Sequence, residues 1–169
     1  HDSSIGYFDS ALIESIAIVF MVLSGINFGL HFFALKEKAL FHYFQDDEVV
    51  WYLLILATAV LMVTLILVSH QVYEAPKAFR LAAFEVVSIF TTTGFATADF
   101  SVWPNMILYL IFFGAFTGAC AGSTGGGMKV IRVLLLFKQG MRELRRLVHP
   151  NGQFAVKIGK KPVEGRVME

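Results

Sequence analysis

The sequence predicts an all-α membrane protein in which spanning helices accompany one shorter, re-entrant segment. Of its 169 residues, 56% are hydrophobic and only 16% are charged, whereas soluble domains average about 25% charged residues. Residues 11–35 and 49–69 are apolar runs long enough to cross the ~30 Å hydrocarbon core of a bilayer. A third apolar run, residues 105–137, would extend roughly 50 Å as a single helix, which exceeds one crossing.

Charge, cysteine content and the start of the chain add three bounds. The net charge of +1 averages scattered acids with basic segments and indicates no class of partner. The single cysteine, Cys120, excludes an internal disulfide framework. The chain begins at His1 without a basic segment ahead of an apolar run, so we expect no signal peptide but an internal piece of a longer protein.

The distribution of Lys and Arg predicts the orientation of the spans. These residues are concentrated in segments 36–48 and 138–169 and are almost absent from 1–10 and 70–77. Because cytoplasmic loops carry an excess of Lys and Arg, we expect the first two segments in the cytoplasm and the other two outside. The chain between the second and third apolar runs then has to enter and leave the membrane from the outer face.

Residues 78–90, AFRLAAFEVVSIF, are amphipathic and too short to span a bilayer. The turn TTTGFAT follows at 91–97. A re-entrant helix followed by an extended turn fits the orientation without another crossing. A short helix lying on the outer membrane surface is the alternative that the pattern leaves open.

The turn has a possible chemical use, because irregular backbone at membrane depth is tolerated only where protein buries it or where it lines a hydrated cavity. An extended Thr-Thr-Gly-Phe segment can aim successive carbonyls at an axis, and four such segments can replace the hydration shell of K⁺. Gly94 can adopt the positive φ that such a segment requires. An ordinary threonine-glycine turn between helices is the alternative.

The stretches TTTGFATADFSVWP and GACAGSTGGGMKVIRVLLLFKQGMRELRRLVHPN resemble the membrane subunit of the Trk/Ktr potassium-uptake systems, closest to TrkH-type proteins. The resemblance covers the chain from His1 to about Lys161. It implies a K⁺-channel-like repeat of outer helix, pore helix, filter loop and inner helix. The implied divisions are a periplasmic segment and repeat-two inner helix at 1–35, a cytoplasmic loop at 36–48, repeat three at 49–137 and a cytoplasmic basic segment at 138–169. Within repeat three they are an outer helix at 49–69, a pore helix at 79–91, a filter loop at 92–97 and a broken inner helix at 105–137.

The resemblance also implies which residues act on the ion. K⁺ would bind at Thr92, Thr93 and Gly94, and the filter would comprise Thr92, Thr93, Gly94 and Phe95. The break in the inner helix would be an intramembrane gate loop, formed by Gly118, Gly122, Ser123, Thr124, Gly125, Gly126 and Gly127.

Physical reasoning supports the gate loop while leaving an alternative for part of it. Glycines let a backbone unwind and move, and an unwound segment below a filter would obstruct the ion path. The four-residue spacing of Gly114, Gly118 and Gly122 also suits close helix packing. Three successive glycines at 125–127 do not fit a packing face, so we interpret them as gate or hinge.

Two charged residues follow the glycines. Lys129 and Arg132 are most simply cations that reach headgroups or water at the cytoplasmic end of the membrane. A role for Lys129 in repelling cations or holding the gate shut is the alternative.

Two kinds of enzyme site were considered for the glycine-rich stretch. A phosphate-binding loop is excluded, because Met128 separates Gly127 from Lys129 and Val130 follows the lysine. An intramembrane serine hydrolase would need Ser123 beside a base, and nothing in the sequence brings His31 to it.

The resemblance implies that the full subunit takes up K⁺ across the bacterial plasma (inner) membrane and is not an enzyme. No cofactor is expected in this chain, and K⁺ is the substrate. The implied partners are membrane lipid, a second copy in a homodimer and a cytoplasmic nucleotide-binding regulatory subunit of the TrkA type, with no nucleic acid. A noncatalytic membrane scaffold subunit without an ion path is the alternative function.

Overall fold

A computed structural model of the chain describes residues 5–39, 41–99, 102–148, 157–158 and 161–162. Much of the expected basic segment 138–169 lies outside these described residues. The elements, in chain order, are η1 Ile5–Phe8, α1 Ala11–Ser24, α2 Phe28–Glu37, α3 His42–Gln45, α4 Asp47–Ser69, α5 Ala75–Phe90, α6 Asn105–Thr117, α7 Val130–Val148, β1 Lys157–Ile158 and β2 Lys161–Pro162. The two short strands pair antiparallel with each other.

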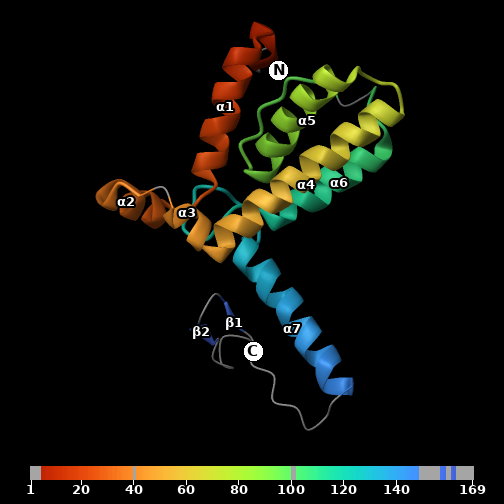
Figure 1. Cartoon of the computed structure of the whole chain (residues 1–169). Helices are drawn as coiled ribbons and strands as arrows, with labels where there is room; N and C mark the ends of the chain where they lie inside the picture. Colours follow the sequence, from red (N-terminus) through yellow and green to blue (C-terminus); the bar gives the residue numbers. More distant parts are fainter. Residues whose placement is uncertain (1–4, 40, 100–101, 149–156, 159–160, 163–169) are drawn as a thin grey trace.

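Helix α5 is the centre of the packed region. It contacts α1, α4 and α6, and α4 and α6 lie beside each other along it (Figure 1). Phe84 and Val86 of α5, Val63 and Leu67 of α4, and Ile107 of α6 are fully buried in the shared core. Helix α5 is therefore covered by the apolar helices α1, α4 and α6 on several sides, as a re-entrant helix has to be.

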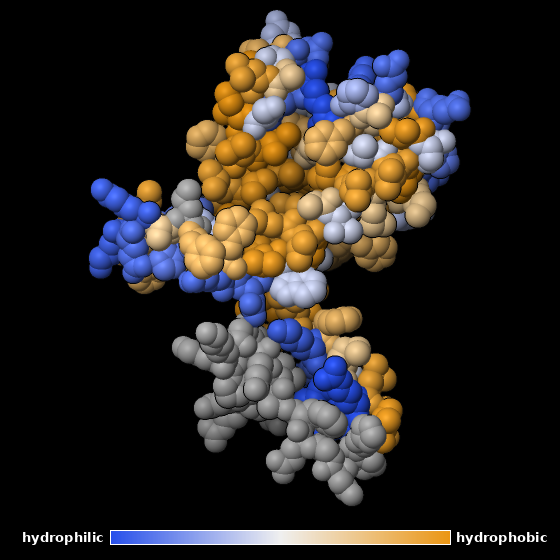
Figure 2. All heavy atoms as spheres, in the orientation of Figure 1, coloured by the Kyte–Doolittle hydropathy of each residue, from blue (hydrophilic) through white to orange (hydrophobic). Residues whose placement is uncertain are grey.

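Much of the outer surface is apolar. Figure 2 shows hydrophobic residues over much of α1 and the middle of the molecule, with hydrophilic residues gathered at the upper ends of α1 and α5 and around α2. The exposed large side chains include Phe20, Leu61, Met106, Phe112 and Phe113. A surface of this kind is stable only where lipid or further protein covers it.

Helix α4 matches the second predicted span. Among the described residues it is the one helix long and apolar enough to cross a bilayer by itself. It begins at Asp47, two residues before the expected start, because the Asp46 carboxylate accepts hydrogen bonds from the backbone N–H groups of Glu48 and Val49 at 2.8 and 3.2 Å. This is a side-chain N-cap.

The expectation of one continuous span over residues 11–35 was wrong. The run is divided into α1 and α2, whose axes differ in direction by 99°, and α2 projects sideways in Figure 1. A Cβ on Gly25 would overlap the hydroxyl of Tyr52 on α4, and that hydroxyl donates to the carbonyl of Val22 at 3.2 Å. The side chain of Asn27 then caps α2 by accepting from Gly29 N–H at 2.8 Å. Close approach of α4 therefore ends α1, and a polar cap begins a new helix.

Two other expected boundaries also moved. The pore helix was expected to begin at residue 79, but α5 begins at Ala75, because Pro76 fits the first turn of a helix, where its missing N–H would have no intrahelical partner. The inner helix breaks as predicted, between α6 and α7, but its second part continues to Val148 and not to residue 137. Apolar side chains keep a helical spacing beyond that point, at Met141, Leu144 and Leu147.

Gly114 on α6 permits the contact between α6 and α5. A Cβ at this position would overlap the ring of Phe90 at the end of α5, and that ring is only 3% exposed. The predicted packing role of Gly114 therefore has a definite partner in the structure.

We predict that Gly114→Ala lowers the stability of the full-length transporter by about 1–3 kcal/mol, the usual range for overpacking a filled site. Adding Phe90→Leu should relieve part of this loss, because the smaller side chain vacates the volume that Cβ needs. Thermal unfolding of the detergent-solubilised protein measures both effects. Gly140→Ala on α7 is the control, since its Cβ would meet nothing within 4 Å, and additive losses for positions 114 and 90 would contradict the packing account.

Candidate functional site

The loop after α5 folds back on the end of that helix. The N–H of Thr92 donates to Ile89 O at 3.0 Å, and the N–H of Thr93 donates to Ser88 O at 2.8 Å. Thr92 and Gly94 have positive φ values of 58° and 82°, which glycine adopts freely and threonine adopts at a cost. The helix therefore stops at Thr91, and the exposed residues 92–95 leave it as a nonhelical loop.

Two hydroxyl groups brace this loop against α5. Ser88 Oγ donates to the carbonyl of Phe95 at 2.6 Å. The hydroxyls of Thr91 and Thr93 are 2.9 Å apart, and Thr91 Oγ1 also donates to Val87 O at 2.7 Å. The Phe95 carbonyl, predicted as part of the filter, is thus engaged by the helix behind it. Sequence reasoning missed Ser88 and Thr91, although a hydroxyl in the last turn before such a loop is the signal that could have found them.

Glu85 holds the exit of the loop. Its carboxylate is fully buried, and Oε1 accepts from Thr97 N–H at 2.6 Å, Ala98 N–H at 2.9 Å and Thr97 Oγ1 at 3.1 Å. The sequence leaves two roles open for Glu85, either a carboxylate bound by the filter surroundings or a source of negative potential, because its partners are not evident from the sequence. One buried acceptor therefore fixes the backbone direction just after the predicted filter.

The predicted gate loop lies directly against the predicted filter. The N–H of Gly126 donates to Thr92 Oγ1 at 2.7 Å, and a Cβ on Gly125 would be 3.3 Å from the carbonyl oxygen of Thr91. The structure therefore brings together two segments that the sequence predicted separately.

The glycines let the loop between α6 and α7 fold tightly on itself. Gly118 and Gly127 have φ values of 66° and 78°. A Cβ on Gly118 would overlap the carbonyl oxygen of Gly126, and one on Gly127 would lie 2.8 Å from Gly118 Cα. Gly122 also has a positive φ, 71°, and lies outside both helices. The helix-packing alternative therefore holds for Gly114 but not for Gly118 or Gly122.

The polar side chains of the loop bind its own backbone or a neighbouring segment. Ser123 Oγ donates to Cys120 O at 2.6 Å, and Thr124 Oγ1 donates to Ser24 O at 3.2 Å. The ammonium of Lys129 donates to the carbonyl of Gly125, whereas Arg132 is exposed on α7. Lys129 therefore closes a short ring within the loop, and Arg132 is placed apart from it.

His31, the base considered for Ser123, is engaged elsewhere. The ring nitrogens of His31 lie 2.8 Å from the Tyr43 hydroxyl and 2.9 Å from the Leu23 carbonyl. These contacts hold α2 against α1 and α3, and they give no support to a hydrolase.

The break between α1 and α2 is joined to the gate loop through backbone groups. The N–H of Cys120 donates to Gly25 O at 2.9 Å, and the N–H of Phe28 donates to Gly122 O at 3.1 Å. Glu48 approaches the loop from a third direction, since its Oε1 accepts from Ala121 N–H at 2.7 Å. Sequence reasoning missed all three of these contacts, because they join segments far apart in the chain.

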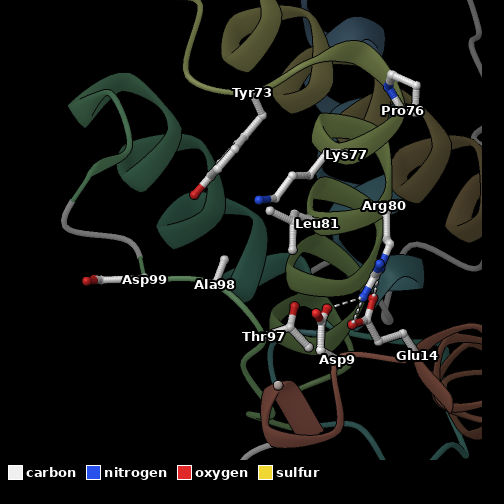
Figure 3. A pocket seen from close by; sticks show the side chains of 11 residues that line it. Asp9, Glu14, Tyr73, Pro76, Lys77, Arg80, Leu81, Thr97, Ala98 and Asp99 are labelled. Carbon is white, nitrogen blue, oxygen red and sulfur yellow. Dashed lines mark hydrogen bonds and ion pairs between the residues drawn. The ribbon is translucent and has the colours of Figure 1, made fainter. Parts of the chain in front are cut away.

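A polar cavity of about 760 Å³ lies between α1, α5 and the segment after the filter loop (Figure 3). Arg80 bridges its wall, with Nε and Nη2 at 2.6 and 2.7 Å from the two carboxylate oxygens of Glu14 and Nη2 at 3.0 Å from Asp9. Figure 3 shows the Lys77 and Tyr73 side chains extending into the same space. The bidentate Arg80–Glu14 pair fixes α5 to α1, because two parallel hydrogen bonds constrain orientation as well as distance.

Comparison with known proteins identifies the family. The family model described as "TrkH: Cation transport protein" matches residues 1–169. The Trk system potassium uptake protein TrkH of Halomonas elongata is 54% identical over 95% of this chain and 33% of its own length. The protein of the same name from Escherichia coli (strain K12) is 48% identical over 100% of this chain and 35% of its own length.

A solved structure agrees with these relatives. The crystal structure of the potassium transporter TrkH from Vibrio parahaemolyticus superposes with a TM-score of 0.94 at 45% identity, over 99% of this chain and 36% of that one. The chain thus spans about a third of the length of the relatives that it matches. The predicted all-α membrane fold and the resemblance are confirmed, and the chain belongs to the TrkH family of cation transport proteins.

Proposed function

We propose that this chain is part of the K⁺-translocating subunit of a potassium uptake system in the plasma (inner) membrane of a bacterium. The names of its relatives support transport of K⁺. K⁺ is then a substrate that crosses the membrane unchanged, and the chain performs no covalent chemistry and uses no cofactor.

The observation that carries this proposal is the hydrogen bond between Gly126 N–H and Thr92 Oγ1. It places a nonhelical, glycine-rich segment against the loop that follows a short re-entrant helix. Carbonyls of Thr92, Thr93 and Gly94, with Phe95 completing the loop, replace water around K⁺ at the filter. The loop containing Gly118, Gly122, Ser123, Thr124, Gly125, Gly126 and Gly127 obstructs the ion path until it is displaced.

The glycines suit this gating role physically. Positive φ at Gly118, Gly122 and Gly127 makes a tight fold of the loop possible without strain. The Lys129 ammonium, bound to Gly125 O, places a fixed positive charge in the blocking loop. That charge opposes entry of a cation while the loop is in place.

The complete protein has partners, and this chain supplies part of the surface that they bind. By analogy with the family, two copies form a homodimer, and a cytoplasmic nucleotide-binding subunit of the TrkA type regulates them. The basic stretch that begins at Arg142 lies at the end of α7 expected in the cytoplasm. Arg142 is paired with Glu143, whereas Arg145 and Arg146 are exposed toward that subunit or anionic lipid.

The scaffold alternative predicts no re-entrant segment and a tolerant surface loop at residues 91–97. Against it stand the buried carboxylate of Glu85 and the hydroxyl of Ser88, both bound to the backbone of that loop. A tolerant surface turn would not require a buried acceptor and a buried donor behind it.

We predict that the full-length transporter rescues growth of an uptake-deficient bacterium at low K⁺. Gly94→Ser should abolish rescue or K⁺ selectivity, because a Cβ disfavours the positive φ of this position. Deletion of residues 125–127 should let cations leak, because it removes the blocking segment. Growth at graded K⁺ and isotope flux measure these effects.

Gly140→Ser is the matched control for Gly94→Ser, since position 140 faces open space on α7. The transport proposal fails if well-expressed wild type neither rescues growth nor passes cations with its cytoplasmic partner present. The gate assignment alone fails if the deletion variant folds, transports and remains as tight as wild type.

We also predict that Glu85→Ala reduces discrimination between K⁺ and Na⁺. Removing three hydrogen bonds to Thr97 and Ala98 frees the exit of the loop and spreads the positions of the filter carbonyls. Glu85→Gln should lose less, because its amide oxygen can still accept from those donors. Competition of Na⁺ with K⁺ flux in proteoliposomes checks this order, and equal selectivity in Glu85→Ala and wild type would show that the carboxylate does not support the filter.

A further inference from the structure

Glu48 binds the gate loop and the first turn of α7 with one oxygen atom. Its Oε1 accepts from Ala121 N–H at 2.7 Å and from Ile131 N–H at 3.2 Å. Ala121 precedes the three-glycine run, and Ile131 lies in the first turn of α7, after it. The carboxylate, which belongs to the outer helix α4, therefore holds these two positions of the chain close together.

We propose that Glu48 is the positioning residue that holds the gate loop in its blocking arrangement. This inference rests on the proposed function of that loop as a gate. Glu48 is only 8% exposed, so its carboxylate has little access to water as a replacement partner for these two N–H groups. Hydrogen bonds to an ionised group are stronger than those between neutral groups, and the loop cannot swing away from α4 without breaking both.

The position of Glu48 is itself fixed. Asp46 Oδ1 accepts from the Glu48 N–H at 2.8 Å. One turn later on the same helix, Tyr52 is buried beneath Gly25 and donates to Val22 O. The first two turns of α4 therefore form a rigid base against which both unwound segments rest.

The other restraints on the loop come mainly from backbone groups and from side chains of the loop itself. Cys120 and Gly122 are paired with the break between α1 and α2 through neutral backbone groups. Lys129 binds within the loop, to Gly125, and interacts electrostatically with Glu48.

The two ends of the loop are also joined by backbone hydrogen bonds, from Met128 N–H to Phe116 O at 2.9 Å and from Val130 N–H to Ala119 O at 3.2 Å. The Glu48 carboxylate is the side chain of α4 that binds this closed loop through two donors, so its loss should release the loop from α4.

Cys120 supplies a readout of loop position that does not depend on ion flux. Its side chain is fully buried in the blocking arrangement, and it should react with a thiol reagent when the loop moves. The full-length transporter, with cysteines outside this chain replaced by serine, is reconstituted without its regulatory subunit. A cationic thiosulfonate is then added from the cytoplasmic side, and K⁺ leak is measured in parallel.

We predict that Glu48→Ala raises the rate of Cys120 modification roughly tenfold or more, the effect expected when a hydrogen bond to a charged group is lost from a closed state. K⁺ leak should rise with it. Glu48→Leu should behave alike while filling the volume, and it replaces Glu48→Ala if that variant does not accumulate in the membrane.

Glu48→Gln separates the hydrogen bonds from the charge. It keeps an acceptor oxygen but removes the charge near the thiol, so modification close to the wild-type rate indicates that the hydrogen bonds hold the loop. Asp47→Asn removes an adjacent charge from the exposed side of the same turn and should change neither rate.

The proposal is overturned if Glu48→Ala and Glu48→Leu react at the wild-type rate while deletion of residues 125–127 leaks. It is also overturned if Glu48→Gln reacts as fast as Glu48→Ala, since charge and not loop closure would then set the rate. If neither the deletion nor the Glu48 variants leak K⁺, the gate assignment is refuted, and the proposed role of Glu48 is refuted with it.

Discussion

Unwound backbone inside a bilayer has to find hydrogen-bond partners, and this requirement governs the arrangement of the chain. Two helices of this protein are interrupted, one at residues 25–27 and the other at 118–129. Each interruption leaves N–H and C=O groups without their helical partners, at a cost of several kcal/mol per unsatisfied group in hydrocarbon. The two interruptions meet this need in part by pairing with each other, through Cys120 with Gly25 and Phe28 with Gly122.

Two glutamates supply further hydrogen-bond acceptors to the irregular segments, one near the predicted filter and one at the gate loop. Glu85 accepts from the backbone just after the predicted filter residues, and Glu48 accepts from the gate loop and from the first turn of α7. Each is a buried acidic side chain whose donors are mainly backbone N–H groups. The irregular segments are thus defined by acceptors on the regular helices α4 and α5, which hold their own positions through the buried core. On this proposal the gate loop can be displaced as a unit, because its internal glycine contacts can persist while its hydrogen bonds to Glu48 break.

Much of the fold could be predicted from hydropathy and length alone. The second span follows from an apolar run long enough to cross a bilayer, and the re-entrant α5 follows from a run too short to do so. The break after residue 117 follows from a run too long for one crossing. The bend between α1 and α2 could not be predicted in this way, because residues 11–35 are apolar enough to span despite scattered polar residues. The bend depends on close packing of Tyr52, on another helix, against Gly25 and on the cap that Asn27 supplies. The continuation of α7 to Val148 shows a related effect, since the basic residues from Lys138 to Arg146 lie within the helix and do not mark its end.

The candidate site was predictable in its segments but not in its contacts. Glycine content located the gate loop, and TTTGF located the filter loop. Glu48 escaped notice because an acidic residue in the first turn of a helix is ordinary on electrostatic grounds. Its second role depends on donors 73 and 83 residues away in the chain, and Ser88 and Thr91 likewise gain their significance only from the loop that folds onto them.

The central claim is that the glycine-rich loop blocks the ion path by resting against the filter loop at Thr92. A Cβ on Gly126 would lie 3.7 Å from Thr92 Cβ, within the usual separation for a disulfide. The decisive measurement is K⁺ flux through the full-length transporter carrying Thr92→Cys and Gly126→Cys, with Cys120→Ser and without other cysteines, before and after oxidation. The account predicts that the disulfide abolishes flux, that reduction restores it, and that either single cysteine is insensitive to oxidant. Undiminished flux through protein in which the disulfide has formed would contradict the account, because the ion path would then be open with the loop held in place.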